Sequence, residues 1–261
     1  MTTIIAVSNE KGGVAKTTTT LSLGAAIAEL NHRVLLIDLD PQANLTLALG
    51  YEPAESVKTS ANVLIESTPI QSAIRKTEFD RIELIPGSGR IESAEQYLPI
   101  RTNYLTTLRS ALEPARRIGY DYVLLDCPPS LGAITLNALA AADLLLIPTQ
   151  AEYFSAYALR NMMSTVRRIR KEANASLAYR ILVTMLDRRN RTHRSIHEQL
   201  VATFGEGVFS TVIELDTKLR ESPIAGQPIT RYKPSSRGSL QYRVLAEELI
   251  EYAKETSQQP A

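Results

Sequence analysis

Residues 10–18 of the chain read EKGGVAKTT and directly follow a short apolar run at residues 4–7. The run is a candidate buried strand, and residues 17–30 have the residue spacing of a helix. A strand, a glycine-bearing turn and a helix that begins at lysine and threonine form a phosphate-binding loop, because backbone N–H groups and the helix N-terminus then face the phosphates. Lys16 would neutralise the β and γ phosphate oxygens, and the Thr17 hydroxyl would ligate Mg²⁺.

The loop departs from the usual phosphate-loop pattern at two positions. That pattern has glycine where this chain has Glu10 and Ala15. Alanine costs about 1 kcal/mol if position 15 needs a positive φ, and it is tolerated if that position is helical. The sequence leaves both conformations open. The alternative to a phosphate loop is a glycine turn that only caps a core helix, but the presence of both Lys11 and Lys16 favours the phosphate loop.

Apolar runs and helical stretches alternate along the rest of the chain. Candidate strands lie at residues 4–7, 34–37, 82–85, 122–125, 144–147, 181–185 and 208–213. Candidate helices lie at residues 17–30, 101–118, 133–141, 154–173, 196–204 and 240–253, and Pro114 should kink or end the second of these. Continuous apolar strands separated by helices predict one doubly wound, mostly parallel α/β sheet with helices on both faces. We expect a single domain over residues 1–255 and a flexible tail at residues 256–261.

Composition narrows the class of protein. The 261 residues are 44% hydrophobic and 22% charged, which is ordinary for a soluble globular chain. The formal net charge is +1, so any nucleic-acid binding must come from a local patch. Cys127 is the single cysteine, which excludes an internal disulfide and fits a reducing cytosol. No apolar run approaches the roughly 20 residues that span a bilayer, and the N-terminus lacks the pattern of a signal peptide.

The loop resembles the deviant Walker A motif of the ParA/MinD family of P-loop ATPases. The resemblance extends over almost the whole chain and is strongest to chromosomal ParA proteins of the Soj type. It implies ATP and Mg²⁺ as cofactors, homodimerisation on ATP binding and weak intrinsic hydrolysis. In the family a second lysine, here Lys11, reaches the partner's nucleotide. The implied nucleotide-binding residues of the loop are Gly12, Gly13, Val14, Ala15, Lys16, Thr17 and Thr18.

Carboxylates follow two of the predicted strands. Asp38 and Asp40 end the second strand, and alternation along an extended chain places them on one side. Asp126 follows the strand at residues 122–125 and resembles the Walker B aspartate, which holds Mg²⁺ through water. By resemblance, Asp40 orients the attacking water and Asp38 supports the Mg²⁺ shell. Without the loop, strand-end aspartates that cap a following helix would be the better interpretation of Asp38 and Asp40.

Two further segments resemble Soj-type proteins. Asp187 and Pro223 stand in such segments and are implied to bind the nucleotide, and in the family the region around Pro223 borders the adenine. The basic run at residues 188–194 and Lys218 suggest a surface that contacts DNA phosphates without reading sequence. The implied DNA-binding residues are Arg188, Arg189, Arg191 and Lys218, and the alternative is a solvated charged face. The segment Glu214-Leu215-Asp216 stands where the family usually has proline-arginine-asparagine.

The resemblance predicts an ATPase that segregates chromosome or plasmid DNA with a ParB-like activator, in the cytoplasm and on the nucleoid. A relative that positions a protein cargo, such as a carboxysome or chemoreceptor array, remains an alternative. A MinD-like membrane ATPase is another, although the acidic residues at 240–253 suit an anionic membrane poorly. A small-molecule ligase or synthetase of this fold would need extra catalytic polar groups, and a non-enzymatic scaffold would need Lys16 or Asp40 to be dispensable.

Overall fold

The computed structural model describes residues 2–52, 57–153 and 155–258. Within these residues seven strands form one sheet in the order β3-β4-β2-β5-β1-β6-β7. Neighbouring strands are parallel except β3 and β4, which run antiparallel. The strands are β1 (Thr3–Val7), β2 (Val34–Asp38), β3 (Arg75–Lys76), β4 (Ile82–Ile85), β5 (Tyr122–Asp126), β6 (Leu144–Gln150) and β7 (Ala178–Thr184). The prediction of a doubly wound, mostly parallel α/β sheet is confirmed.

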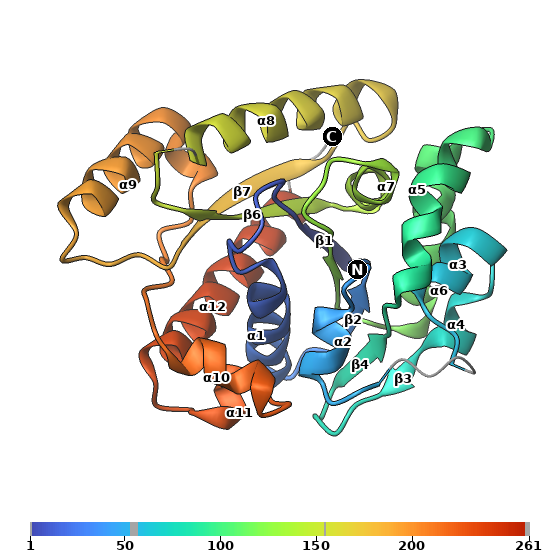
Figure 1. The fold of residues 1–261 in the computed structure, drawn as a ribbon, viewed down its shortest axis with the longest axis horizontal. Coiled ribbons are helices and arrows are strands. Elements are labelled where there is room, and N and C mark those ends of the chain that lie inside the picture. Colours follow the sequence, from blue (N-terminus) through green and yellow to red (C-terminus); the bar gives the residue numbers. More distant parts are fainter. Residues whose placement is uncertain (1, 53–56, 154, 259–261) are drawn as a thin grey trace.

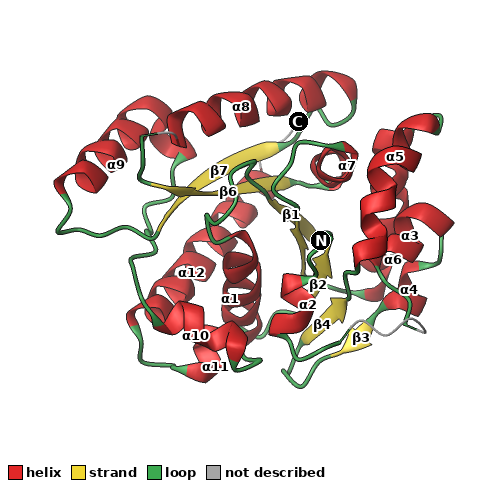
Figure 2. Ribbon diagram, viewed as in Figure 1, coloured by secondary structure: helices red, strands yellow, loops and turns green. Residues whose placement is uncertain are grey.

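Helices cover both faces of this sheet (Figures 1 and 2). The first half of the chain forms α1 (Lys16–Glu29), α2 (Asn44–Ala48), α3 (Ser60–Glu66), α4 (Ile70–Ala73), α5 (Ala94–Tyr97) and α6 (Thr107–Ile118). The second half forms α7 (Ala133–Ala141), α8 (Ser155–Glu172), α9 (Arg191–Phe204), α10 (Lys218–Ile224), α11 (Ile229–Tyr232) and α12 (Arg237–Gln258). In Figure 1, α1 and α12 lie side by side below β6 and β7, while α8 lies above them and α7 lies to their right.

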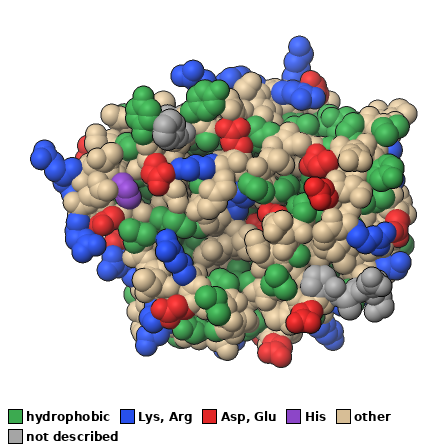
Figure 3. Space-filling view, viewed as in Figure 1, with side chains coloured by type: hydrophobic (Ala, Val, Ile, Leu, Met, Phe, Trp, Pro, Cys, Tyr) green, Lys and Arg blue, Asp and Glu red, His purple; other side chains and the backbone are tan. Residues whose placement is uncertain are grey.

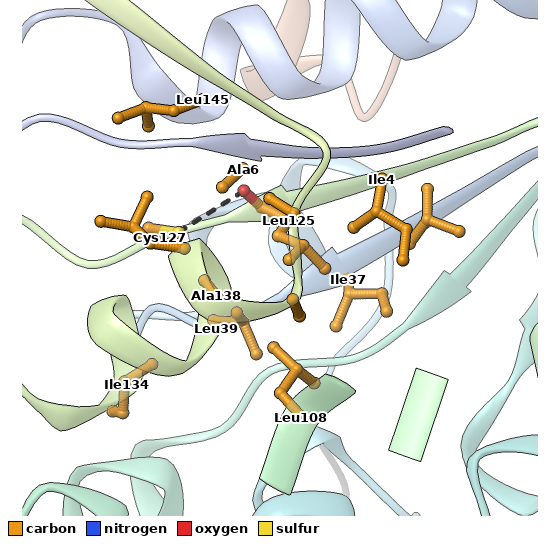
Figure 4. Packing of buried hydrophobic residues seen from close by; sticks show 14 of the residues in the cluster. Ile4, Ala6, Ile37, Leu39, Leu108, Leu125, Cys127, Ile134, Ala138 and Leu145 are labelled. Carbon is orange, nitrogen blue, oxygen red and sulfur yellow. Dashed lines mark hydrogen bonds between the residues drawn. The ribbon is translucent and has the colours of Figure 1, made fainter. Parts of the chain in front are cut away.

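Alternation along the strands divides the core into two layers. In β2, Leu35 and Ile37 pack in the layer under α3, α6, α7 and α8, whereas Val34 and Leu36 pack against α1 and α12. Figure 4 shows the first layer, in which Cys127 is fully buried among aliphatic side chains. Because both faces of the strands are buried, the strands have the continuous apolar sequence of a parallel sheet.

The expected strand at residues 208–213 is wrong. This segment runs along the outer edge of β7, where the N–H groups of Phe209 and Ile213 bond to β7 carbonyls. It forms only isolated bridges at Val208 and at Glu214. The N–H groups of Ser210 and Thr211 donate instead to the Glu248 carboxylate of α12, at 2.7 and 3.0 Å. A side chain from a distant helix therefore takes the place of ladder hydrogen bonds.

The expected helix at residues 101–118 is shorter than predicted. Asn103 has φ 58° and precedes a 3₁₀ turn at Tyr104–Thr106, so α6 begins only at Thr107. Pro114 lies inside α6 and does not end it. The helix stops at Gly119, whose φ of 92° gives the left-handed conformation that glycine adopts without strain.

The start of α8 and the end of α12 lie next to residues that the structure does not describe. The helix expected from residue 154 is described from Ser155, because Phe154 lies outside the described residues. α12 reaches Gln258, three residues into the segment expected as a flexible tail. Residues 259–261 of that segment lie outside the described residues.

Candidate functional site

The loop between β1 and α1 is anchored on the carboxyl ends of β6 and β7. Gln150 Nε2 donates to the Gly13 carbonyl at 3.0 Å, and Thr184 Oγ1 donates to the Val14 carbonyl at 3.1 Å. Asn9 Oδ1 accepts from the Lys11 N–H at 3.0 Å. Side chains from three strand ends thus hold the loop at the edge of the sheet where open α/β folds bind ligands.

The loop needs a left-handed backbone at two positions. Gly13 has φ 75°, which glycine adopts without strain. Ala15 has φ 69° and ψ 33° and precedes the first residue of α1. Position 15 therefore requires a positive φ, and alanine there costs about 1 kcal/mol relative to an unstrained residue. Strain of this size is often found where a backbone approaches a ligand.

Lys16 is buried at the start of α1. Its ammonium donates to the Lys11 carbonyl at 3.1 Å, which folds the side chain back over the loop. Burial lowers the pKa of Lys16, and the charges of Asp126 and Asp40 oppose this shift. A buried ammonium with one backbone acceptor can gain strongly from a phosphate group, because its interaction energy rises as water is excluded. Thr17 follows in the first turn and is half-buried.

Three carboxylates meet at the ends of β2 and β5. Asp38 and Asp126 are register partners on these neighbouring strands, and both are fully buried. Asp126 Oδ1 accepts from Thr20 Oγ1 at 3.2 Å, while Asp126 Oδ2 has no hydrogen-bond partner among the residues that the structure describes. Burial and then the charge of Asp38 raise the pKa of Asp126. A buried carboxylate oxygen without a hydrogen-bond partner destabilises the folded protein unless a cation or a proton binds to it.

The environment of Asp38 differs from that of Asp40. Asp38 accepts from Thr46 Oγ1 at 2.6 Å, from the Thr46 N–H at 2.9 Å and from the Asp40 N–H at 3.1 Å. Burial raises the pKa of Asp38 to about 6, and the Thr46 hydrogen bonds oppose this shift. Asp40 Oδ1 accepts from the Gln42 N–H at 2.9 Å. Asp40 keeps 7% of its surface exposed, whereas Asp38 keeps none.

A glycine makes room for Asp38. A Cβ at Gly87 would lie 2.7 Å from Asp38 Cγ, closer than side-chain atoms pack. The Gly87 N–H also donates to Thr46 Oγ1 at 2.8 Å. The loop after β4 therefore positions Thr46, whose hydroxyl in turn donates to Asp38. Sequence reasoning missed both Thr46 and Gly87 as parts of the site. Gly87 stands in the turn Pro86-Gly87-Ser88-Gly89, which in the sequence indicates only the end of the strand at residues 82–85, and no motif surrounds Thr46.

The residues suit a magnesium ion shared with phosphates. Among the described residues, no group of three or more His, Cys, Asp or Glu side chains forms a closed metal site. Magnesium usually keeps several waters and binds one or two protein groups plus substrate phosphates. The unpartnered Asp126 Oδ2, with Thr17 at the start of α1, matches that requirement better than a preformed protein cage would.

Lys11 forms an ion pair with Glu152, which lies just after β6. Lys11 Nζ lies 2.5 Å from Glu152 Oε2 and 3.4 Å from Gln150 Oε1. The side chains of Lys11 and Glu152 are 28% and 48% exposed, so the pair lies at the surface beside the loop. A lysine that reaches this far over the sheet edge is available to another molecule that docks there.

Of the predicted basic residues, the three arginines are exposed and Lys218 is half-buried. Three of the four residues form ion pairs within the chain. Arg188 Nε lies 2.6 Å from Glu214, Arg189 Nε lies 3.1 Å from Asp187, and Lys218 Nζ lies 2.7 Å from Glu221. Asn190 caps α9, which begins earlier than residue 196, so Arg191 lies in the first turn of the helix. Figure 3 shows Lys and Arg side chains along the side of the molecule that α9 forms, interspersed with acidic ones.

The structure places Asp187 and Pro223, the two nucleotide-binding residues predicted outside the phosphate loop, on different elements. Asp187 follows β7, near the Thr184 side chain that holds the phosphate loop. Its carboxylate is engaged by the N–H and side chain of Arg189, which lowers the pKa of Asp187. Pro223 lies inside α10, a helix that packs against α2.

The fold and this site define a P-loop nucleotide-binding protein. The AAA_31 family, described as an AAA domain, matches residues 2–179. Sporulation initiation inhibitor protein Soj of Bacillus subtilis is 39% identical over 247 residues, covering 94% of this chain and 97% of Soj. Chromosome partitioning protein ParA of Caulobacter vibrioides is 39% identical over 249 residues, covering 95% and 93%. A solved structure of cobyrinic acid a,c-diamide synthase from Mycobacterium smegmatis, with bound ADP and magnesium, is 32% identical. It has a TM-score of 0.84 and covers 100% of this chain and 99% of the synthase.

The chain belongs to the ParA/MinD family of P-loop ATPases. Its cofactors are ATP and Mg²⁺, in keeping with the bound nucleotide and metal of the similar structures. Across the described residues, none of the helices combines the length and apolar character needed to cross a membrane.

Proposed function

We propose that this chain is a ParA-type ATPase that dimerises on ATP binding, holds DNA without sequence preference and releases it after hydrolysis stimulated by a ParB-like partner. It would act in the cytoplasm on the nucleoid. The observation that carries the proposal is the second lysine, Lys11, which a surface ion pair with Glu152 and a longer hydrogen bond to Gln150 hold beside the phosphate loop. The 39% identity with Soj and ParA over nearly whole chains supports the same conclusion.

The phosphate loop holds the triphosphate in this proposal. Backbone N–H groups of residues 12–18 and the Lys16 ammonium bind the β and γ phosphates. Thr17 and Asp126 hold the magnesium ion, and Asp38 supports its shell. When bound, the ion neutralises charge on the phosphate oxygens and helps orient them. Asp126 has an unpartnered oxygen for this role, whereas the oxygens of Asp38 are engaged by Thr46 and Asp40.

Asp40 orients the attacking water. It is the more exposed of the two aspartates at the end of β2, so its carboxylate can reach a water at the mouth of the site. Asp38 is enclosed and positions Asp40, because it accepts the Asp40 N–H. Hydrolysis by one protomer alone is slow, since Lys11 of the partner must neutralise the developing phosphate charge. Asp187 and Pro223 border the base.

The DNA surface uses Arg188, Arg189, Arg191 and Lys218. Their contacts reach phosphates and not base edges, so binding is independent of sequence and sensitive to salt. Each protomer offers a modest surface, because acidic neighbours partner three of the four residues. A dimer doubles it, which makes DNA binding depend on nucleotide.

DNA co-sedimentation tests the proposal. Wild type is compared with ATP and Mg²⁺, with ADP and without nucleotide, beside Lys16→Ala and Arg189→Ala. Arg90→Ala is the matched control, since Arg90 is an exposed arginine paired with Glu66 by an ion pair of 2.7 Å. We expect DNA binding only with ATP, lost in Lys16→Ala and Arg189→Ala and kept in Arg90→Ala.

Other outcomes point to other functions. Dimerisation with ATP but no DNA binding in any state would overturn the DNA role and favour a protein cargo or a membrane. The exposed Glu247 and Glu251 of α12 argue against an anionic membrane. ATP turnover with neither dimerisation nor DNA binding would favour a small-molecule synthetase, to which the 32% identity with the diamide synthase gives independent support.

A further inference from the structure

Glu214 lies between two arginines, Arg188 after β7 and Arg237 at the start of α12. Its Oε1 lies 2.6 Å from Arg188 Nε, and its Oε2 lies 2.7 Å from Arg237 Nη1. The Glu214 side chain is only 13% exposed, whereas Arg188 and Arg237 are 64% and 61% exposed. The two arginines hold the pKa of Glu214 below its usual range, despite the opposing effect of burial.

The backbone fixes this arrangement. Leu186 and Glu214 form a parallel bridge, and the Glu214 N–H donates to Gln241 Oε1 of α12 at 2.9 Å. Asp216 accepts from the Gly238 N–H at 2.8 Å, which ties the first turn of α12 to the same segment. Arg237 is therefore placed beside Arg188 by folding, although 49 residues of sequence separate them.

These side chains border a common hollow with the predicted DNA residues. A cavity of about 270 Å³ is lined by Asp187, Arg188, Arg189, Glu214, Leu215 and Arg237. Three cations and two anions line it, so its local charge is +1 and not +3. A guanidinium group has five N–H donors, and the bonds to Glu214 engage Arg188 Nε and Arg237 Nη1. The remaining N–H donors of both arginines can thus bind a phosphate group. The negative charge of Glu214 reduces the attraction of this surface for phosphate.

We propose that Arg237 is a further phosphate-contacting residue of the DNA surface, and that Glu214 is an internal competitor that weakens this surface. The inference rests on the proposed DNA binding. The Glu214 carboxylate engages one donor on each guanidinium group and offsets part of their positive charge, so both arginines attract a backbone phosphate less strongly. DNA affinity is then set low enough for a dimer to release when the nucleotide site opens.

Glu214→Gln is the first test, measured as DNA affinity with an ATP analogue over a range of salt concentrations. Glutamine keeps the size of the side chain and one acceptor oxygen but removes the charge. We expect binding several-fold to about ten-fold tighter near 0.1 M salt, and a log–log salt slope steeper by about one for each contacting protomer. Glu66→Gln is the matched control, because it removes an arginine-paired carboxylate far along the chain at α3, and it should change neither value.

Arg237→Ala is the second test and does not disturb a buried residue. We expect weaker DNA binding and a shallower salt slope by about one per protomer, with Arg90→Ala unchanged. Unchanged or weaker binding by Glu214→Gln, or an unchanged slope in Arg237→Ala, overturns the inference while leaving DNA binding by wild type intact. If wild type and Glu214→Gln both ignore DNA in every nucleotide state, the proposed DNA function itself fails.

Discussion

Lys11 and Glu152 form an ion pair of 2.5 Å that joins the phosphate loop to the end of β6 within one protomer. Both side chains are partly exposed, and pairs of this kind stabilise a protein by about 0–1 kcal/mol. A triphosphate carries several negative charges and competes readily with one carboxylate. The pair therefore holds Lys11 in its own subunit only weakly, which suits the role that we propose for Lys11 at a partner's nucleotide.

Glu152→Gln should tighten dimerisation with an ATP analogue by up to about five-fold for each Lys11 that is released, because up to about 1 kcal/mol per ion pair no longer opposes the release. Sedimentation velocity at several protein concentrations measures this change. Glu172→Gln is the control, since Glu172 pairs with Arg168 on α8 at similar exposure. Weaker dimerisation by Glu152→Gln would show that Glu152 stabilises the dimer.

Ala15→Gly should leave the stability of the nucleotide-free protein unchanged or raise it by up to about 0.6 kcal/mol. Glycine relieves a left-handed backbone strain of about 1 kcal/mol, while its greater freedom in the unfolded chain costs about 0.4–1 kcal/mol. Urea unfolding measures the difference. Ala28→Gly is the comparison inside α1, where glycine should destabilise by about 1 kcal/mol. Destabilisation by Ala15→Gly equal to that of Ala28→Gly would contradict the strain at position 15.

The raised pKa of Asp38 predicts a dependence of stability on pH. The folded state takes up a proton with a pKa of about 6, whereas the unfolded state does so near 3.8. Between these values the folded state binds more protons, so the free energy of unfolding decreases as pH rises. The loss from this group amounts to about 3 kcal/mol and is complete above pH 6 to 7.

Urea unfolding of nucleotide-free wild type and Asp38→Asn from pH 4 to 7 checks this expectation. The difference in unfolding free energy between the two should change with pH through this window and then level off. Comparison of the two proteins cancels the contribution of His197, whose lowered pKa has the opposite effect. A constant difference from pH 4 to 7 would show that Asp38 titrates alike in both states.

Gly87→Ala should destabilise the protein by about 1–3 kcal/mol and weaken Mg²⁺-dependent nucleotide binding. The added methyl group would lie 2.7 Å from Asp38 Cγ and force the carboxylate away from Thr46. Gly89→Ala is a matched control in the same loop, because a Cβ there meets only the Pro41 carbonyl at 3.9 Å. Thermal unfolding and binding of a fluorescent nucleotide measure both effects. Equal stability of the two variants would refute the close packing at Gly87.

The parallel sheet could be predicted because its signals are local. Each central strand is a short apolar run, and Lys16 follows the first of them at the spacing of a phosphate loop. Asp38 and Asp126 could be placed at strand ends for the same reason. Their register partnership depends on strand order, which no local pattern contains, although the carboxyl ends of parallel strands share one edge.

Features set by distant contacts could not be predicted. The apolar segment at residues 208–213 has the composition of a strand, but Glu248 bonds its N–H groups from 37 or more residues away. Pro114 has the sequence signal of a helix end, yet packing of Leu112 and Ala115 in the core keeps α6 continuous around it. The engagement of Arg188 by Glu214 likewise depends on the fold and is invisible in a count of basic residues.

The carboxylate of Glu248 has a consequence for how the protein behaves when concentrated. The outer margin of a sheet normally offers open amide groups to any extended chain, and such pairing leads to fibrils. Here residues 208–214 cover the outer edge of β7. The Glu248 carboxylate accepts hydrogen bonds from the N–H groups of Ser210 and Thr211, so these groups are not open to another chain. Its negative charge also repels acidic segments that approach. At high concentration the protein is thereby protected from an association that would not reverse.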